Sequence, residues 1–430
     1  MPQKKRRFDA PKVRRSLTLE IIELGAQGDG LAKGPDGPVY VPRTVPGDEV
    51  NAQVVGQKAE SFELVKAGPD RQDPPCPHFV DCGGCALQHL SRDAYRTHKM
   101  KTLEETFRKV GLELPAVNSV WGHEASRRRT TFKARGRGKG AVLGYQTTGS
   151  HHLVRVDRCL ILTEGLQNAL PDVRHLASSI LAPGEEATIA LSECENGIDV
   201  SITLDPDLYE ERRLEVLEKL GSAAKTADIA RITVNGEPAL VARTPVVRFD
   251  GIAVSPPYNA FLQPGLEGEN VLRELVLENR PEKKNGRAVD LFAGCGTFSL
   301  PLARSFDVIA YESEGAQVTA LENAARVASL SGLKTVRRDL VREPLGDLEL
   351  RKIDYVVLNP PRAGAKGQAE ELARSKVPAI TYISCNPGTL ARDAKILQSG
   401  GYSLTSITLL DQFVYSAHSE CIAIFRKDQT

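Results

Sequence analysis

In the C-terminal part of the chain, short apolar runs alternate with segments in which apolar residues recur at helical spacing. Such alternation is typical of a sheet whose strands are mostly parallel and are covered by helices on both faces. From about residue 255 onward we therefore predict a doubly wound α/β sheet. Its strands are expected at 287–292, 308–311, 334–337, 354–358, 379–384, 404–410 and 420–425.

The N-terminal part has a different pattern, in which short β-branched and apolar runs are separated by turns that contain Gly and Pro. Several short strands in about 50 residues predict a small closed β-barrel. Barrels of this kind often bind nucleic acid, although a barrel with a purely structural role fits the pattern equally well. The strands are expected at 17–22, 38–41 and 49–55.

Between these two regions the pattern is mixed. The runs 187–191 and 198–202 have the character of strands, and 212–220 has the periodicity of an amphipathic helix. At 430 residues the chain is too long for a single core. We predict four parts: a basic arm (1–15), a small β-barrel (16–70), a mixed central domain (71–254) and the α/β domain (255–430).

The net charge of +1 indicates nothing about partners, but the cations are unevenly distributed. They gather in the N-terminal arm and in a second cluster, where they could meet the phosphates of a nucleic acid or form a solvated face. The residues concerned are Lys4, Lys5, Arg6, Arg7, Lys12, Arg14 and Arg15 in the arm, and Arg127, Arg128, Arg129, Lys133, Arg135, Arg137 and Lys139 in the second cluster.

No apolar run is long enough to cross a bilayer, and the charged N-terminus is not followed by the apolar segment of a secretory signal. We therefore expect a cytoplasmic protein without a membrane partner, and a monomer. The eight irregularly spaced cysteines fit reduced thiols and a metal site better than a disulfide framework.

Three cysteines, Cys76, Cys82 and Cys85, lie close together among Pro and Gly residues, which makes them poor core material. Their spacing, C-x5-C-x2-C, would let thiolates converge on a metal. A fourth ligand is required, and Cys159 is the best candidate. Four thiolates with a single CxxC pair favour an iron-sulfur cluster over structural zinc.

A glycine turn, residues 292–298, follows the first strand of the predicted α/β sheet. Glycines there would let the backbone approach a ligand closely. The next strand ends in Glu312, placed to accept hydrogen bonds from a ribose. Ser299 stands where a dinucleotide site would have its third glycine, so the turn fits S-adenosyl-L-methionine better, although a plain tight turn is also possible.

The fourth strand of this sheet is followed by the run Asn359-Pro360-Pro361-Arg362. A rigid loop without a ligand would explain it, but such a run also lines the pocket of enzymes that methylate exocyclic amino groups. Those enzymes have an aromatic residue in fourth place to stack on a base. Arg362 lacks that face, so we rank carbon methylation above amino-group methylation.

The fifth strand ends at Ser384-Cys385-Asn386-Pro387, where a helix begins. A cysteine at a strand end has a fixed direction, and the N–H groups at a helix start favour the thiolate. Cys385 is thus a candidate nucleophile. In isolation, the better explanation would be a small apolar residue that caps a buried strand.

Taken together, these runs resemble the RNA uracil-C5 methyltransferases, and most closely the bacterial 23S ribosomal RNA branch with an N-terminal TRAM barrel and a 4Fe-4S cluster. The resemblance covers nearly the whole chain, and the run 384–393 is its most specific part. It implies that Cys385 is the nucleophile and Glu420 the general base. It also implies that Gln263, Phe292, Thr297, Glu312 and Asn359 lie around S-adenosyl-L-methionine, and that Cys76, Cys82, Cys85 and Cys159 bind the cluster.

The chain departs from the family's pattern at three positions. The family usually has Asn where Gly265 stands, often Asp where Asn359 stands, and Asn where Thr297 stands. All three departures concern the expected contacts with the cofactor, and none concerns the expected nucleophile or base.

The reaction that the resemblance implies requires a covalent step, because C5 of uracil is a poor nucleophile. Attack of Cys385 on C6 would create an enolate that accepts the methyl group, and Glu420 would then remove the C5 proton. Ribosomal RNA is the expected substrate, with transfer RNA as the alternative. A non-catalytic RNA-binding iron-sulfur protein is a second alternative, and a radical enzyme is disfavoured because the C-x3-C-x2-C spacing is absent from the sequence.

Overall fold

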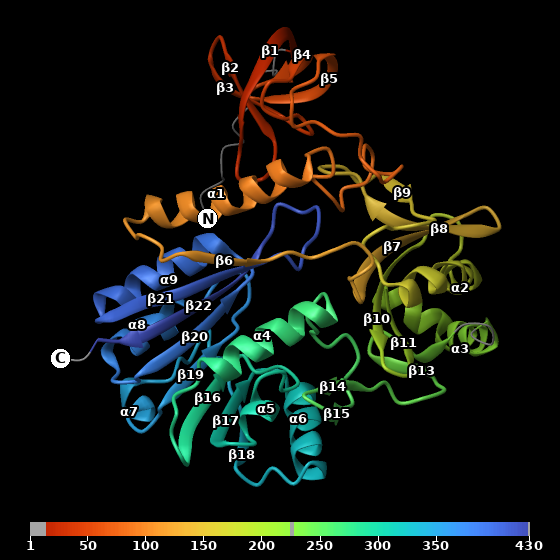
Figure 1. The fold of residues 1–430 in the computed structure, drawn as a ribbon. Helices are drawn as coiled ribbons and strands as arrows, with labels where there is room; N and C mark the ends of the chain where they lie inside the picture. The colour runs from red at the N-terminus through yellow and green to blue at the C-terminus, as the bar shows by residue number, and fades with distance from the viewer. Residues whose placement is uncertain (1–13, 224–227, 429–430) are drawn as a thin grey trace, which may run out of the picture. The chain divides into compact units, whose positions relative to one another are not determined.

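The computed structural model (Figure 1) describes residues 14–223 and 228–428, and these fall into two compact units. Unit 1 comprises the described residues up to Val80, Gly84–Thr102 and Tyr415–Ala417. Unit 2 comprises the remaining described residues. They lie in three stretches: Asp81–Gly83, Leu103–Val414 and the residues from His418 onward. Three residues near the C-terminus therefore fold with the N-terminal unit.

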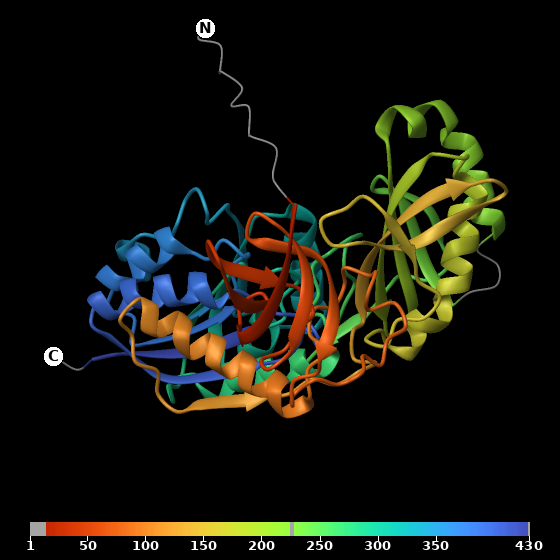
Figure 2. The ribbon, with the colours of Figure 1, turned by 90° about the horizontal axis from the view of Figure 1, so that it is seen from above.

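Unit 1 is built around a closed five-stranded barrel with the strand order β1-β2-β3-β5-β4, and Figure 2 shows its strands from above. Alternate side chains of a strand point to the same side. In β4 this alternation buries Val50, Ala52 and Val54 in the barrel core. The elements are β1 (Arg14–Leu24), β2 (Gly30–Gly34), β3 (Gly37–Val41), β4 (Glu49–Val55), β5 (Lys58–Lys66) and the helix α1 (Arg92–Lys109), which continues into unit 2.

The first part of unit 2 contains a seven-stranded sheet with the order β13-β12-β11-β10-β7-β8-β9. Helix α2 buries one apolar side against the core of this sheet, including Leu166, Leu170 and Val173, and α3 packs beside α2. The elements are β7 (Arg129–Arg137), β8 (Gly140–Gln146), β9 (Leu153–Arg155), α2 (Glu164–Ile180), β10 (Glu186–Cys194), β11 (Gly197–Leu204), α3 (Pro206–Ala223), β12 (Ile229–Val234) and β13 (Glu237–Val241).

The second part of unit 2 is an α/β sheet of eight strands in the order β18-β17-β16-β19-β20-β22-β21-β6. The strands β16 to β20 are parallel, and β22 is inserted antiparallel between β20 and β21. Its elements are β6 (Val117–Val120), β16 (Gly286–Leu291), α5 (Ser299–Leu302), β17 (Phe306–Glu312), α6 (Gly315–Val327), β18 (Leu333–Arg337), α7 (Asp347–Leu350), β19 (Tyr355–Leu358), α8 (Lys366–Arg374), β20 (Ala379–Ser384), α9 (Pro387–Ser399), β21 (Tyr402–Leu410) and β22 (Glu420–Lys427).

A short hairpin of β14 (Val247–Phe249) and β15 (Ile252–Val254), then α4 (Leu266–Glu278), connect the two sheets along the chain. In the α/β sheet the strand order reverses between β16 and β19, because β17 lies on the far side of β16. Ligands of open α/β sheets bind outside the carboxyl ends of the strands at such a reversal. The Asn359 N–H donates a hydrogen bond to the Leu291 carbonyl at 3.2 Å and joins the two strand ends there.

The predicted fold class is confirmed, including the doubly wound sheet, the N-terminal barrel and the mixed central region. The sequence did not indicate β6, which pairs in parallel with β21 at the sheet edge. Most of the predicted basic arm, including Lys4, Lys5, Arg6, Arg7 and Lys12, lies outside the described residues. Among the described helices, none combines the length and apolarity that a membrane span requires.

The prediction that the second basic cluster forms a cationic surface is wrong for Arg128. Its guanidinium is buried and forms an ion pair with Glu269 at 2.6 Å. The Arg129 side chain donates to the Leu262 carbonyl, and burial lowers its pKa to about 10. Arg135 pairs with Glu186 on the neighbouring strand. Charge counted along the sequence therefore overstated the cationic surface at this cluster.

Candidate active site

Two antiparallel strands bring the predicted nucleophile and the predicted base to neighbouring strand ends. Ser384, the last residue of β20, is paired with Cys421 of β22. One further step along this register sets Cys385 opposite Glu420. Residues opposite each other on antiparallel strands point to the same face, with Cβ atoms about 5 Å apart. The two side chains interact electrostatically in the structure.

The Cys385 thiol is half-buried, and its pKa is raised from the ordinary value of a cysteine. Burial is the largest cause, and the carboxylate of Glu420 adds to it, because both disfavour a second negative charge. Arg362 acts in the opposite direction, since its guanidinium hydrogen-bonds the sulfur and lowers the pKa. A backbone hydrogen bond at Cys385 also lowers the pKa, in the direction expected from N–H groups at this position, but burial and Glu420 outweigh it.

Arg362 is a site residue that the sequence reasoning missed, since it was considered only as the missing aromatic of the run 359–362. A signal was available: the run follows β19, and Cys385 follows its parallel neighbour β20. Residues that follow neighbouring parallel strands meet at the same edge of a sheet. The guanidinium of an arginine in that position can reach the thiol.

Glu420 is the first residue of β22, and its side chain is buried, with 4% of its surface exposed. Burial raises its pKa to about 8, because a carboxylate in an apolar environment loses the hydration of its charge. A carboxyl group with this pKa is a stronger base than an ordinary glutamate. It can remove a proton and hold it at neutral pH.

The start of α9 fixes the segment around Cys385. The Asn386 side-chain oxygen accepts the Gly388 N–H at 3.0 Å and so caps the helix. The amide nitrogen of the same side chain donates to the Arg362 carbonyl at 3.2 Å. Thr389 donates to this carbonyl as well, at 3.4 Å. One helix start thus holds both the nucleophile's segment and the loop that carries Arg362.

The predicted cofactor turn has an unusual backbone. Phe292, Gly294 and Gly296 all have positive φ, at 64°, 58° and 95°. For a bulky residue such as Phe292 this conformation is strained, and strain of this kind gathers at ligand sites. Thr297 lies in the same turn and is half-buried.

Glu312 closes the turn from the end of β17. One carboxylate oxygen accepts the Gly294 N–H at 2.9 Å, and the other accepts the N–H groups of Ser313 and Glu314 at 2.7 and 3.0 Å. These donors fix the carboxylate and leave the first oxygen with a second lone pair for a ligand hydroxyl. The geometry suits recognition of a ribose.

Ser299, which stands where a dinucleotide site would have glycine, bonds a buried acid instead. Its hydroxyl donates to Asp290 at 2.5 Å, and burial raises the pKa of this carboxyl group to about 7. The serine therefore serves the packing beneath the turn. This agrees with a turn that does not surround a pyrophosphate.

Gln263 lies before α4 and is buried. Its side-chain oxygen accepts a hydrogen bond from the side chain of Gln412 at 3.1 Å, and its carbonyl accepts one from Arg128. Gln412 belongs to the segment that leads from β21 to Glu420. Gly265, at the N-cap of α4, makes no side-chain cap, and a Cβ added there would lie 3.1 Å from the Ser126 carbonyl oxygen.

Two of the four predicted cluster cysteines lie near the Tyr145 side chain. Burial raises the pKa of Tyr145, and charge on Cys159 and on Cys82 raises it further. The Gly83 N–H donates to the Gln146 carbonyl at 3.1 Å, which fixes the residue after Cys82 at the end of β8. Cys82 and Cys159, far apart in sequence, therefore share one neighbourhood in unit 2.

The other two predicted cluster cysteines, Cys76 and Cys85, belong to unit 1. The Cys76 N–H donates to the side chain of Gln88 at 3.1 Å. All four thiols are half-buried. Over residues 14–223 and 228–428, no group of three or more His, Cys, Asp or Glu side chains is placed to hold a single metal ion.

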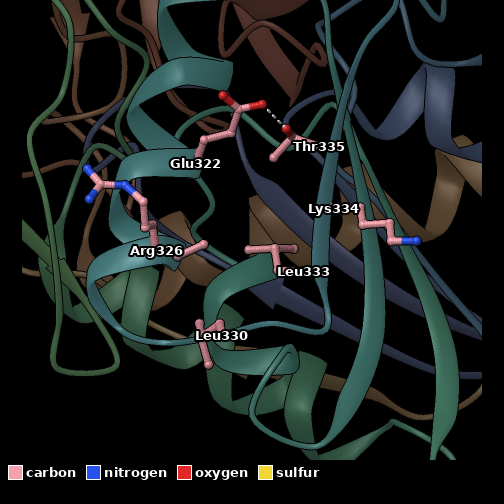
Figure 3. A pocket seen from close by; sticks show the side chains of 7 residues that line it. Glu322, Arg326, Leu330, Leu333, Lys334 and Thr335 are labelled. Atoms are coloured by element: carbon pink, nitrogen blue, oxygen red, sulfur yellow. Dashed lines mark hydrogen bonds between the residues drawn. The ribbon is translucent and has the colours of Figure 1, made fainter.

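A separate pocket lies between α6 and β18 (Figure 3). The Thr335 hydroxyl and Glu322 form a hydrogen bond across it at 2.5 Å, and Leu330 and Leu333 form part of its wall. Its lining comes from the second half of α6, the connection that follows this helix and the start of β18. The predicted cofactor residues instead follow the carboxyl ends of the strands, so this pocket does not belong to the candidate active site.

Comparison with known proteins identifies the family to which the sequence is similar. The family model described as tRNA (Uracil-5-)-methyltransferase matches residues 251–428. An uncharacterized RNA methyltransferase of Agrobacterium fabrum is 40% identical over 95% of this chain and 99% of its own length. The 23S rRNA (uracil(1939)-C(5))-methyltransferase RlmD of Chromohalobacter salexigens is 32% identical over 95% of this chain and 89% of its own length.

Among solved structures, the tRNA (uracil-54, C5)-methyltransferase of Pyrococcus abyssi, in complex with S-adenosyl-L-homocysteine, has a similar fold. The TM-score is 0.74 at 24% identity, over 95% of this chain and 99% of that one. At this identity the likeness supports the fold alone.

Proposed function

This chain belongs to the RNA uracil-C5 methyltransferase family, and we propose that it methylates C5 of a uridine in 23S ribosomal RNA with S-adenosyl-L-methionine as methyl donor. The observation that carries the proposal is the placement of the Cys385 thiol and the Glu420 carboxyl group at adjacent strand ends. Ribosomal RNA is preferred because the relative that acts on 23S rRNA is 32% identical to this chain, whereas the transfer RNA enzyme of similar fold is 24% identical.

Cys385 begins the reaction. Its thiolate adds to C6 of the uracil ring, a sulfur–carbon bond forms, and the electron pair of the C5–C6 double bond moves toward C5 and O4. The nucleophilic C5 then takes the methyl group from the sulfonium donor. Arg362 supports the first step, because its hydrogen bond to the sulfur stabilises the negative charge.

Glu420 completes the reaction. After methyl transfer, C5 carries both the methyl group and its original proton. The carboxylate accepts this proton, the electron pair restores the C5–C6 double bond, and the sulfur–carbon bond breaks. The buried position gives Glu420 the basicity that this step needs, with a pKa of about 8.

The methyl donor would lie over the strand reversal between β16 and β19. Glu312 would accept the ribose hydroxyls with its available lone pair, and the strained turn at Phe292 and Thr297 would pass close to the donor. Asn359 would line the neighbouring strand end, and Gln263 the side near α4. When bound, the donor supplies the electrophilic methyl group.

We also propose a 4Fe-4S cluster bound by Cys76, Cys82, Cys85 and Cys159. The proximity of Cys82 and Cys159 to Tyr145, together with the short C-x2-C step from Cys82 to Cys85, supports this ligand set.

Iron and acid-labile sulfide should be measured in protein purified without oxygen. Cys159→Ser is expected to lower both, whereas Cys194→Ala, at a buried cysteine in the core, should leave both unchanged. Full iron and sulfide content in Cys159→Ser would contradict the ligand set.

RNA around the target would be bound by two parts of the chain. One is the barrel of residues 16–70, as a TRAM-like domain, and the other is the central domain of residues 71–254. A stacked and paired base cannot reach a thiol at a strand end, so the uridine would be unstacked or flipped into the site. Residues 255–430 would form the methyltransferase domain.

The catalytic proposal is tested with a tritiated methyl donor and 23S rRNA transcribed without modifications. Cys385→Ala should abolish methyl transfer, and Glu420→Gln should accumulate a covalent protein–RNA adduct that survives denaturing electrophoresis. Cys194→Ala controls for the loss of a cysteine. Methyl transfer at the wild-type rate by Cys385→Ala would contradict the mechanism.

The substrate is tested in cells that lack the protein. The proposal predicts that 5-methyluridine disappears from one position of 23S rRNA and is retained in transfer RNA. Loss from transfer RNA alone would instead support the alternative substrate.

A further inference from the structure

The segment between β21 and β22, residues 411–419, leads directly to Glu420 and folds with both compact units. Its beginning belongs to unit 2, where Gln412 bonds Gln263. Its middle, Tyr415–Ala417, belongs to unit 1. From His418 onward the chain is again part of unit 2. Glu420, the residue proposed as general base, therefore lies three residues after Ala417, the last residue of the tip that folds with unit 1.

Three groups of unit 1 bind this tip through its backbone, and we call them the tip clamp: the N–H groups of Ala86 and Leu87 and the hydroxyl of Tyr95. Both N–H groups donate to the Tyr415 carbonyl, at 2.8 and 2.9 Å. The Tyr415 N–H donates to the Tyr95 hydroxyl oxygen at 3.1 Å. One residue of the tip thus has both its backbone donor and its backbone acceptor bound.

The clamp also holds Tyr415 in an unfavourable conformation. Its φ is 62°, a value that large side chains seldom adopt. The rings of Tyr95 and Tyr415 lie 6.2 Å apart at 60°, a favourable tilted arrangement for two aromatic rings. Strain of this kind persists only where the surroundings enforce it, and it often accompanies function.

The clamp itself is well anchored within unit 1. Leu87 is fully buried and packs so closely on the barrel turn that a Cβ at Gly28 would lie 2.4 Å from its side chain. Tyr95 belongs to the first turn of α1, is 7% exposed, and has the ammonium group of Lys99 over its ring at 4.9 Å. A clamp with fixed parts can impose a position on a segment that follows it.

We propose that the tip clamp positions Glu420 for removal of the C5 proton, and that Tyr95 is a positioning residue for this step. The inference rests on the proposed role of Glu420 as base. Glu420 lies five residues after Tyr415, the residue that the clamp binds, and five residues span at most about 18 Å. A shift of Tyr415 must therefore be absorbed within residues 416–419 or passed to Glu420. Ser419 and Glu420 are buried, and this limits how much they can absorb.

The proposal separates two steps of the reaction. Cys385 follows β20, whereas the clamp acts on the segment before β22. Loosening the clamp should therefore leave the attack on C6 and the methyl transfer nearly unchanged. It should slow only proton removal, so the covalent adduct would persist.

The clamp donors directly follow Cys85, one of the proposed cluster ligands. A bound cluster would fix Cys85 and, with it, the N–H groups of Ala86 and Leu87. Removal of iron with a chelator should then increase hydrogen exchange in the peptide 411–419, a measurement that does not depend on activity.

The test uses the full-length protein with Tyr95→Phe, which removes the hydroxyl that accepts the Tyr415 N–H and keeps the ring. Tyr209→Phe is the matched control, because it also removes a single tyrosine hydroxyl. That hydroxyl donates a hydrogen bond to Glu237 in the first part of unit 2. Circular dichroism and calorimetric binding of S-adenosyl-L-homocysteine establish that each variant is folded. Tyr95→Leu, which also removes the ring, provides a graded second variant.

We expect Tyr95→Phe to slow release of the adduct by about fivefold, the effect of one lost hydrogen bond, and Tyr95→Leu to slow it further. Hydrogen exchange of the peptide 411–419 should rise in both, and adduct formation in a single turnover should stay within twofold of the wild type. Tyr209→Phe should match the wild type throughout.

The inference is overturned if Tyr95→Phe and Tyr95→Leu release the adduct at the wild-type rate, or if formation and release slow equally. A different result would show that the proposed role of Glu420 as base is wrong: Glu420→Gln would then form no persistent covalent adduct with RNA. A persistent adduct in Glu420→Gln together with normal release in both Tyr95 variants refutes the clamp alone.

Discussion

At the scale of single residues, the chemistry of the site depends on which charges face the Cys385 sulfur. Burial and Glu420 favour the neutral thiol, and Arg362 favours the thiolate. A half-buried thiol with a raised pKa is protected from adventitious reactions. It becomes nucleophilic when a substrate or a rise in pH alters this balance.

Removal of the Glu420 charge should make Cys385 more reactive at alkaline pH. Glu420 has a pKa of about 8, so below that pH it is mostly neutral and affects the thiol little. Above pH 8 its negative charge opposes ionisation of the sulfur. Glu420→Gln should therefore increase alkylation of Cys385 by iodoacetamide roughly threefold at pH 9, and change it little at pH 7.

The measurement is mass spectrometry of the peptide that contains Cys385 after timed alkylation. The control is Glu186→Gln, which changes a carboxylate paired with Arg135 in the seven-stranded sheet. Equal rates in Glu420→Gln and the wild type at pH 9 would contradict the electrostatic contact.

In the wild type, the rate of methylation should rise with pH from 7 to 9, because the Cys385 thiol and the Glu420 carboxyl group must both lose a proton.

Loss of the Arg362 guanidinium should have the opposite effect on the sulfur. Arg362→Ala removes the hydrogen bond and the positive charge that lower the pKa of Cys385. Alkylation at pH 8 should slow by roughly three- to tenfold, an effect limited by the exposure of the arginine. Arg362→Lys should restore part of the rate, because it keeps the charge. Arg342→Ala, at an exposed arginine, should have no effect, and an unchanged rate in Arg362→Ala would refute the contact.

At the scale of elements, one helix start coordinates two strand ends. Asn386 caps α9 and also bonds the loop after β19, so the segment with Cys385 and the segment with Arg362 are held by one side chain. Catalytic loops at the carboxyl ends of parallel strands gain a fixed geometry from such shared contacts.

Asn386→Ala should therefore affect both stability and catalysis. Loss of the cap should lower the free energy of unfolding by about 1 kcal/mol. Because the loop loses its bond as well, kcat should fall by more than KM rises. Thr163→Ala, at the N-cap of α2 where no side-chain cap bond exists, is the matched control for stability. Differential scanning calorimetry and steady-state kinetics provide the measurements, and a wild-type kcat in Asn386→Ala would contradict the prediction.

At the scale of the whole molecule, a buried ion pair joins the first part of unit 2, which contains the seven-stranded sheet, to the second part, which contains the α/β sheet. Arg128 precedes β7, and Glu269 lies in the first turn of α4. Burial raises the pKa of Glu269, and the arginine opposes this. The pair depends on both partners, because either charge alone would be buried without compensation.

Arg128→Ala should therefore destabilise unit 2 by about 3–5 kcal/mol, since it leaves a buried carboxylate unpaired. The double variant Arg128→Met/Glu269→Leu should recover most of this loss. Arg248→Ala breaks an exposed pair with Glu195 and should cost at most about 1 kcal/mol. Urea unfolding followed by the fluorescence of the single tryptophan, Trp121, measures all three. If Arg128→Ala lowers the free energy of unfolding by less than about 1 kcal/mol, the Arg128–Glu269 pair does not stabilise unit 2 as predicted.

Much of this protein could be predicted from local sequence. Apolar periodicity indicated the strands of the α/β sheet, and the observed β16, β20 and β22 begin within one residue of the predicted positions. Strand ends also indicated where chemistry could occur, because Glu312 ends β17, and Asn359 and Cys385 directly follow β19 and β20. Periodicity depends on near neighbours in the chain, so the sequence alone carries it.

Only the tertiary structure decided which of these strand ends meet. The insertion of β22 between β20 and β21 brings Glu420 to Cys385, and the neighbouring end of β19 brings Arg362 to the same sulfur. The burial of Arg128, which the sequence presented as a surface cation, was decided in the same way. These features depend on pairings between residues far apart in the chain, and the burial and register that select such pairings exist only once the whole domain has folded.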